Sequence, residues 1–550
     1  MRPVSHHAAE LLAQLNPDPS WRERLRDRDA STVRALTALV EHAGVALVAH
    51  VAPFAFGRSA AVRQAAAKVL DRVLETSTPA ELIELDKVCR QRTGPYTARA
   101  MNDWDALTPR RLSLLHKLGR LTPSSLGLAS FHGNGYLREA AISRLDASSG
   151  GNELAFLLVR LNDWVPSVAQ RARVAVERRI VPSYAAAWLA WAPLLLRLGP
   201  STRRPAADLS ERVLDLLLAV EQRPVLLASL SSGNRLTRRF ALRLLHRVQS
   251  SPQDRAGIVM TAARNRDTVL RLQAVAYAQE HLSTEELAHA IPPMLADRYS
   301  PVRRAAVDAA AERLGHLASG WLVNALGDRA STVREVARYH LERRGELTDF
   351  ASHYRHELGA ASTAPALSVA VAGVGETGTR ADAVLLVPFL DHKSAGVRRS
   401  VARALAMLDL DGQVHRLLPL LDDASPRVSR MAREALHRRT GAVEAEPLQR
   451  LLRQAVHLHG RLGALALAAT LSKWDSIPLF LEAASAREAR IREEGAARIA
   501  TWLAKQNESF ARPSPRQLAA LRTSLHAHGD VLVARIRSEL ASVLEYWATH

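Results

Sequence analysis

The stretch that decides the fold is Ile291–Arg303, IPPMLADRYSPVR, because close copies of it recur along the chain. Two such copies are VPFLDHKSAGVR at residues 387–398 and LPLLDDASPRV at residues 418–428. In each copy a proline precedes an anchoring valine by the same interval, namely Pro293 before Val302, Pro388 before Val397 and Pro419 before Val428. Self-similarity of this kind indicates a repeat architecture, in which one supersecondary unit is stacked many times.

The anchoring valines set the period of the repeat. Val302 and Val333 are about 31 residues apart, as are Val397 and Val428, which is within the range of two-helix repeats. An aspartate stands at one fixed offset before several anchors, and these aspartates are Asp163, Asp297, Asp328 and Asp423. Weaker anchors, most of them followed closely by arginine, extend the series to Val33, Val62, Leu137, Val168, Leu236, Leu270 and Ile491.

Each anchor opens an amphipathic helix. Val302, Ala306, Ala309 and Ala310 follow the spacing of one buried helical stripe. The dipeptide Ser300-Pro301 is a start signal, since serine favours the N-cap and proline the first helical position. The apolar run before each anchor supplies a partner helix, so the repeat is a helix pair that must bury its apolar faces against its neighbours.

We therefore predict an all-α protein, a solenoid of stacked antiparallel helix pairs with a period of about 31 residues, curved into a superhelix. The regular repeats span residues 131–440. Divergent helical repeats are expected at 1–130, and divergent repeats with a cap at 441–550, all in one continuous solenoid.

The composition agrees with packed helices in a reducing compartment. Hydrophobic residues make up 47% of the 550 residues but aromatic residues only 5%, so the core is mostly Ala, Leu and Val. A single cysteine, Cys89, excludes an intramolecular disulfide framework. The longest apolar stretch, Tyr184–Leu196, is shorter than the roughly 20 residues of a membrane span. We expect a cytoplasmic protein without membrane insertion.

These repeats resemble HEAT repeats, particularly the short variety shared by phycobilin lyases and many bacterial adaptor proteins. The resemblance covers most of the chain and is clearest over residues 265–439. In HEAT families the turn aspartate and the arginine after the valine form a ladder of hydrogen bonds between adjacent repeats. The resemblance assigns this structural role to Asp297, Arg303, Asp328, Arg334, Asp391 and Arg398. Asp391 sits one place early and Ser429 stands where the next arginine is expected, so the ladder adjusts there.

The formal net charge of +19 favours anionic partners, although arginine-rich composition alone also produces it. Paired arginines recur near helix ends and are candidates for an anion-binding stripe along the array: Arg203 and Arg204, Arg238 and Arg239, Arg303 and Arg304, Arg343 and Arg344, Arg398 and Arg399, Arg438 and Arg439. Such a stripe could follow a phosphate backbone. The competing interpretation is that these arginines cover apolar surface, bind helix C-terminal carbonyls or join the ladder.

No motif predicts a catalytic centre, a metal site or a cofactor. The segment Gly373–Gly378 matches G-x-G-x-x-G, but the repeat register places it in a turn between helices and lacks the βαβ unit that dinucleotide binding needs. His353 and His356 have their glutamate in the wrong order for a zinc protease. Trp104-Asp105 and Asp163-Trp164 could imitate the groove of HEAT-like DNA glycosylases, yet Trp164 is expected to pack between helices.

Three functions remain open from the sequence. The first is a non-enzymatic scaffold or adaptor that holds a protein partner on its concave surface. The second is a nucleic-acid-binding solenoid that uses the arginine stripe. The third is an enzyme of the HEAT-like class with a groove site.

Overall fold

The computed structural model describes residues 6–15, 28–57, 59–90, 104, 106–198, 207–248, 251–439, 443–506, 508 and 511–549. Throughout these residues the regular elements are helices, with no strand among them. The chain divides into two compact units, residues 1–309 and 310–550, and the boundary falls within one helix, α20 (Ser300–Leu314).

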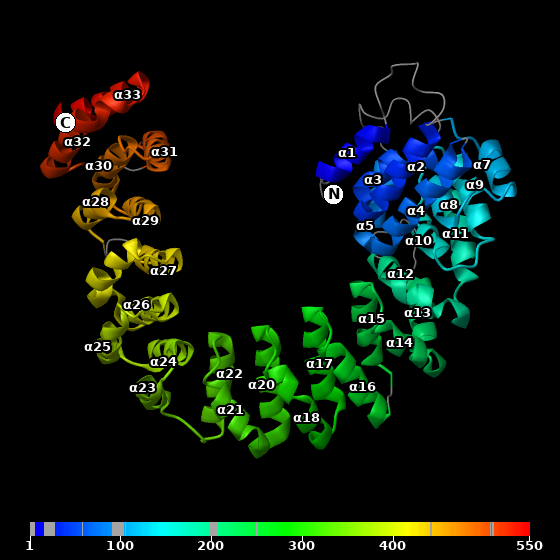
Figure 1. Ribbon diagram of the computed structural model, residues 1–550, viewed down its shortest axis with the longest axis horizontal. Coiled ribbons are helices and arrows are strands. Elements are labelled where there is room, and N and C mark those ends of the chain that lie inside the picture. The colour runs from blue at the N-terminus through cyan, green and yellow to red at the C-terminus, as the bar shows by residue number, and fades with distance from the viewer. Residues whose placement is uncertain are drawn as a thin grey trace. The chain divides into compact units, whose positions relative to one another are not determined.

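The first unit consists of helices stacked one after another (Figure 1). Its α-helices before α20 are α1 (His6–Leu15), α2 (Arg28–Leu39), α3 (Val45–Val51), α4 (Ala60–Thr76), α5 (Pro79–Arg90), α7 (Pro109–Lys117), α8 (Pro123–Ala129), α9 (Gly135–Leu145), α10 (Glu153–Arg160), α11 (Pro166–Glu177), α12 (Ala185–Leu198), α13 (Ala207–Leu218), α14 (Arg223–Ser229), α15 (Arg235–Leu245), α16 (Pro252–Ala263), α17 (Thr268–His281), α18 (Thr284–Ala290) and α19 (Pro292–Leu295).

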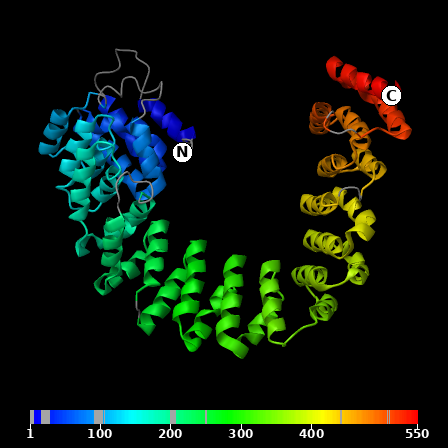
Figure 2. The same cartoon turned by 180° about the vertical axis from the view of Figure 1, so that it is seen from behind.

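The second unit repeats the same plan (Figure 2). Its α-helices are α21 (Ser319–Ala325), α22 (Ser331–Arg343), α23 (Phe350–Ala360), α24 (Ala364–Thr377), α25 (Ala383–Leu386), α26 (Ala395–Leu417), α27 (Pro426–His437), α28 (Ala445–Gln454), α29 (Leu458–Ala468), α30 (Lys473–Ala484), α31 (Ala489–Lys505), α32 (Pro515–His528) and α33 (Ala534–Thr549).

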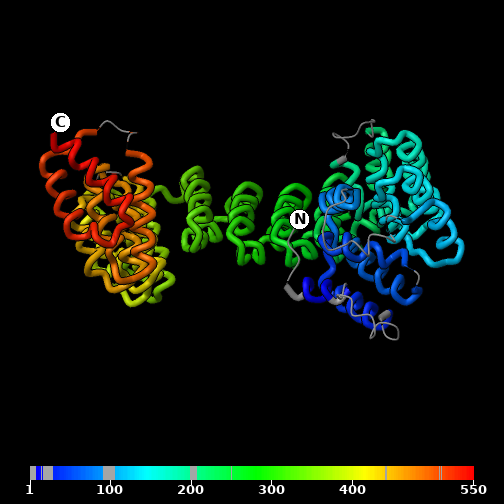
Figure 3. The backbone as a smooth tube through the Cα atoms, turned by 90° about the horizontal axis from the view of Figure 1, so that it is seen from above, coloured from blue at the N-terminus to red at the C-terminus, as the bar shows by residue number. Residues whose placement is uncertain are grey.

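Each repeat is an antiparallel pair, and equivalent helices of successive repeats pack side by side. In the second unit α27 contacts α29, which contacts α31, while α28 contacts α30, which contacts α32. The first unit has the same two layers, for example α15 beside α17 and α16 beside α18. Figure 3 shows the same helices from above, coloured along the chain. The prediction of an all-α solenoid of stacked helix pairs is confirmed.

The anchoring residues are buried as predicted, because they begin the second helix of each pair. Val302, Val333, Val397 and Val428 are each at most 1% exposed. Helices approach closely at the small residues that follow, such as Ala306 and Ala432, which are both fully buried. Ser425 occupies the N-cap of α27, but its side chain makes no capping hydrogen bond, and the carboxylate of Asp423 accepts the Ser425 N–H instead.

A sharp bend lets α26 serve two repeats. Asp409 has an extended backbone, with φ −161° and ψ 72°, inside the span Ala395–Leu417. Its carboxylate accepts a hydrogen bond from the N–H of Gly412, so Asp409 caps the start of a new helical segment. The residues after the bend, together with the 3-10 helix η9 (Pro419–Asp422), therefore form the first helix of the repeat whose second helix is α27.

The expectation of a turn at Gly373–Gly378 is wrong, because Gly373 and Gly375 lie inside helix α24. Both are buried where neighbouring helices approach closely. A Cβ at Gly373 would lie 2.2 Å from the ring of Tyr354, and one at Gly375 would lie 2.6 Å from the Cβ of Ala404. The glycines thus serve helix packing rather than a phosphate loop.

Within the described residues, none of the helices combines the length and apolar character that crossing a membrane requires.

Candidate functional site

A recurring arginine closes the turn between the two helices of a repeat. In each case its guanidinium donates to the carbonyl of a residue six positions earlier, just before the second helix begins. We call these residues the ladder arginines, and they are Arg63, Arg138, Arg238, Arg271, Arg303, Arg334, Arg398, Arg461 and Arg492. The bond satisfies a carbonyl that the helices leave free at the turn.

Several ladder arginines also bind a carboxylate of the following repeat. Arg138 reaches Asp163 at 2.8 Å, and Arg398 reaches Asp423 at 2.7 and 2.8 Å, both through two parallel bonds. Burial by itself raises the pKa of Asp423, but the hydrogen bonds from Arg398 and from the Ser425 N–H bring the net pKa below its usual range. The charged pairs therefore link adjacent repeats.

Most residues predicted for the ladder form hydrogen bonds at the turns, but within the described residues Asp391 does not. Arg303 and Arg334 donate to the carbonyls of Asp297 and Asp328 at 2.7 and 2.6 Å, and Asp297 accepts from Arg271. Asp391 is exposed, because the six-residue spacing to Arg398 makes His392 the turn residue. The imidazole of His392 accepts the Ser394 N–H at 3.0 Å, as an aspartate does in other repeats.

Glu376 is a ladder residue that sequence reasoning missed. It pairs with Arg334, and with Arg338 at 2.9 Å, from the C-terminal end of α24. Because Glu376 lies inside a helix rather than at the turn offset, the spacing of the aspartates carries no signal for it.

The Asp163-Trp164 pair belongs to a buried ionic network. Asp163 is bound by Arg138 and Arg160 at 2.8 Å and by Arg90 at 3.4 Å. Burial tends to raise the pKa of Asp163, but the Arg138 hydrogen bond, the Val165 N–H and the Arg160 charge lower it overall. A carboxylate held charged by three arginines is a structural anion and a poor general base.

The expectation that Trp164 packs between helices is wrong. Its side chain is 53% exposed, with the guanidinium of Arg90 at 4.2 Å and that of Arg138 at 4.7 Å from the ring centroid. The ring stays at the ionic network rather than in the core, because both guanidinium groups are attracted to its π-system. Trp104 is buried beside Phe56 and His132, and Asp105 lies outside the described residues.

The arginine pairs predicted as an anion-binding stripe separate by their place on the helix. Arg238, Arg303 and Arg398 are ladder arginines near the start of a second helix, and Arg239, Arg304 and Arg399 follow them directly. The other pairs, Arg343-Arg344 and Arg438-Arg439, lie at the opposite end of α22 and α27. These positions are about 9 residues, or 13 Å of helix, apart, so the two groups of pairs lie near opposite ends of their helices.

Many of these arginines already bind the protein. Arg239 pairs with Asp267 and Arg439 with Asp411, while Arg344 donates to the carbonyls of Ala311 and Gly315. Within the part of the chain that the structure describes, the members that are exposed with no such bond are Arg304, Arg343, Arg399 and Arg438. Arg203 and Arg204 lie outside the described residues.

Exposed cations gather on two neighbouring second helices of the second unit. Arg399 and Arg403 lie one turn apart on α26, and Arg427 and Arg430 lie one turn apart on the adjacent α27. We call these four residues the α26–α27 surface. All four are exposed, and none has a hydrogen bond or ion pair to any other described residue. Asp423, in the turn between the two helices, is paired with Arg398.

Apolar side chains adjoin these cations. Met407 continues the Arg399–Arg403 stripe at the same four-residue spacing and is 48% exposed. On α29, which packs against α27, Leu458 is 41% exposed. The surface thus offers cationic and apolar groups together, a combination that an amphipathic acidic segment can match.

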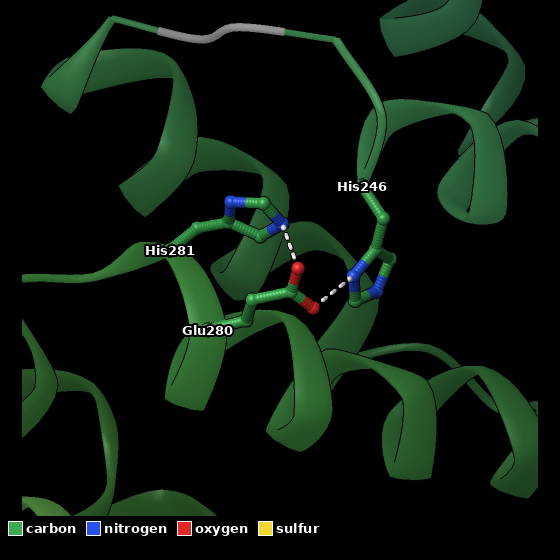
Figure 4. A group of neighbouring side chains, drawn as sticks. All are labelled: His246, Glu280 and His281. Carbon is green, nitrogen blue, oxygen red and sulfur yellow. Dashed lines mark hydrogen bonds and ion pairs between the residues drawn. The ribbon is translucent and has the colours of Figure 1, made fainter.

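A second cluster contains potential metal ligands. His246 follows the last residue of α15, and Glu280 and His281 end the neighbouring helix α17 (Figure 4). Their three ligand atoms all lie within 4.8 Å of one another. The pair His457 and His459 is different, because both rings bind the Asp422-Asp423 turn and support the repeat. Sequence spacing missed the first cluster, because His246 lies in one repeat and Glu280 and His281 lie in the next.

Comparison with known proteins adds little beyond the fold. No protein-family model matches the chain, and no curated protein matches it either.

Solved structures of karyopherins have similar stacks of helices. Kap95p, in a structure concerned with the switch loops of RanGDP, is 12% identical over 85% of this chain and 66% of its own, with a TM-score of 0.37. Kap121p bound to Pho4p is 13% identical over 99% of this chain and 69% of its own, with a TM-score of 0.33. Importin beta is 12% identical over 98% of this chain and 80% of its own, with a TM-score of 0.28. Likeness this distant carries no inference about partners.

Proposed function

We propose that this chain is a non-enzymatic scaffold that binds a protein partner, and that the α26–α27 surface receives an acidic, amphipathic segment of that partner. One layer of helices lines the concave face of a curved repeat array, and we assign that role to the second helices. The observation that carries the proposal is the set of exposed, unpaired arginines on two adjacent second helices, with Met407 beside them.

The electrostatic argument is direct. Each arginine of the α26–α27 surface is solvated and has no acidic partner among the described residues, so binding a carboxylate breaks no existing ion pair. Rim charges of this kind mainly raise the association rate and select partners of opposite charge. The affinity would come from the apolar contacts beside them, such as Met407, because methionine adapts to varied partners.

A nucleic acid is the second candidate, and the same arginines favour it. Four phosphate contacts would give a salt dependence with a log–log slope of about −3.6 for duplex DNA. The exposed apolar side chains favour the protein partner, since backbone phosphates offer nothing for Met407 or Leu458 to contact.

The test uses three forms of the full-length chain. The variant R399Q/R430Q removes one cation from each helix, and R304Q is the matched control, because Arg304 also follows a ladder arginine and is exposed. Each is used to capture partners from extract of the native host, with and without nuclease, and binding of the recovered partner is then titrated.

We expect a protein that survives nuclease, binds the wild type and R304Q equally, and binds R399Q/R430Q at least tenfold more weakly. Recovery of nucleic acid that is released by moderate salt and lost in R399Q/R430Q would establish the second candidate instead. Equal binding by all three forms would show that the α26–α27 surface is not the site.

A further inference from the structure

The C-terminal ends of two neighbouring second helices bring three metal-binding side chains together in the first unit. His246 belongs to the end of α15, and Glu280 and His281 are the last two residues of α17 (Figure 4). The two helices pack against each other, so the cluster depends on the stacking of adjacent repeats. It lies in a different unit from the α26–α27 surface and is independent of the function proposed for that surface.

The cluster is compact enough for its three ligand atoms, which lie within 4.8 Å of one another, to converge on one metal ion, and His246 and Glu280 are also joined by a hydrogen bond. Nδ1 of His246 lies 3.3 Å from one carboxylate oxygen of Glu280, and Nε2 of His281 lies 3.8 Å from the other. Tetrahedral zinc, with bonds of about 2.0–2.2 Å, separates its ligand atoms by about 3.3–3.6 Å. The separation at His281 is too long for a hydrogen bond.

A buried nitrogen gives a second, independent indication. Nε2 of His281 is shielded from solvent and has no hydrogen-bond partner among the described residues. A buried polar atom left in this state costs about 1–3 kcal/mol, so native structures rarely retain one without a reason. The nitrogen is directed toward Glu280, where a cation bound by the carboxylate would satisfy it (Figure 4).

Aromatic packing orients the two imidazoles. The ring of Tyr277, which is fully buried, lies 4.9 Å from that of His246 and 4.4 Å from that of His281, measured between centroids. A fixed ring orientation reduces the entropy lost on binding a metal. Glu280 is 64% exposed, so the cluster is open on one side, where water can complete the coordination.

One charge opposes a cation here. Arg255 donates to the backbone carbonyl of His281 at 3.0 Å and places a positive charge near the cluster. The Glu280 carboxylate offsets that charge only in part, so the site should be weaker than a four-ligand structural zinc site. The competing explanation is that His246 and His281 simply stabilise the negative ends of their helices.

We propose that His246, Glu280 and His281 bind one divalent transition-metal ion, with Zn²⁺ the best match and a fourth position open to water. Two histidines and one carboxylate are a ligand set that zinc accepts in sites with an open position. Mg²⁺ and Ca²⁺ should not bind, because they prefer oxygen ligands.

The test compares the full-length wild type with H246Q/H281Q and with H289Q. His289 is an exposed histidine of the same unit whose ring contacts the Glu285 carbonyl, so H289Q controls for adventitious binding by surface histidines. Chelator-treated protein is titrated with Zn²⁺ by calorimetry, and with Co²⁺ while its visible absorption is recorded. Circular dichroism in chelator checks that each variant is folded.

We expect the wild type and H289Q to bind one more equivalent of Zn²⁺ than H246Q/H281Q, and their Co²⁺ complexes to show the intense bands of tetrahedral coordination. Zn²⁺ should also raise the Tm of the wild type and H289Q but leave that of H246Q/H281Q unchanged. If the folded H246Q/H281Q variant binds Zn²⁺ with the stoichiometry and affinity of the wild type, or if the wild type binds none, the proposal is wrong.

Discussion

Arg398 and Arg399 are adjacent in the sequence but should respond to substitution in opposite ways. Arg398 is 16% exposed, binds Asp423 through two bonds and donates to the His392 carbonyl, whereas Arg399 is exposed with no bond to a described residue. We therefore expect Arg398→Met to destabilise the second unit and Arg399→Met to leave its stability unchanged.

The magnitude follows from the groups that lose a partner. Breaking a buried ion pair costs about 3–5 kcal/mol, and Asp423, at 6% exposure, would keep only the Ser425 N–H as a donor. Because Arg398 is partly solvated, we expect a loss below this range, of about 2–3 kcal/mol. Arg399→Met should change the free energy of unfolding by less than about 0.5 kcal/mol.

Two measurements check this expectation. Urea denaturation followed by circular dichroism gives the change in unfolding free energy for each variant. The Ser425 N–H donates a hydrogen bond to Asp423, so its hydrogen-exchange rate reports on the turn itself. This rate should increase only in Arg398→Met. Equal stability losses in the two variants would refute the division of these arginines into ladder and surface.

Two further predictions concern the second unit. Gly375→Val should destabilise the second unit by about 2–3 kcal/mol or more and separate α24 from α26, since a Cβ there would lie 2.7 Å from the Ala404 backbone. Thermal melting followed by circular dichroism measures the loss. The control is Gly359→Val, because a Cβ at Gly359 meets no atom within 4 Å. Hydrogen bonds from Arg355 and Thr379 lower the pKa of Asp382 to about 2. The contribution of Asp382 to the free energy of unfolding is therefore complete above its unfolded pKa near 4, and it is lost as the pH falls from about 4 to 2. Because Arg355 is 39% exposed, we expect this contribution to be only about 1–2 kcal/mol. Unfolding measured against pH should show this acid dependence in the wild type and less of it in Asp382→Asn, and identical curves would contradict the assignment.

The repeat architecture could be predicted because its signals are local. The buried valine, the alanines one and two turns later and the proline before them all lie within one helix pair, so they recur at a fixed period. The resemblance to HEAT repeats, and not the period, assigned Arg303, Arg334 and Arg398 to a ladder, and in the structure each donates to a carbonyl six residues before it. Periodicity alone was therefore enough for the fold.

Two glycines and one tryptophan were misassigned for a different reason. Gly373 and Gly375 are compatible with a turn or with close helix packing, and only the position of Tyr354 and Ala404 decides for a helix. Trp164 has an apolar ring, which favours burial, but two guanidinium groups compete with the core for its face. Such choices depend on neighbours that are distant in the sequence.

Taken by itself, the sequence determined the helix pairs, their period and the burial of the anchoring valines, because these follow from spacing within a single repeat. The tertiary structure decided which of the paired arginines stay exposed without an ion pair to a described residue, as Arg399 beside Arg398 shows. It also brought His246 to Glu280 and His281. The physical reason is that such sites form between repeats, where the packing of one helix against the next places side chains that have no fixed spacing along the chain.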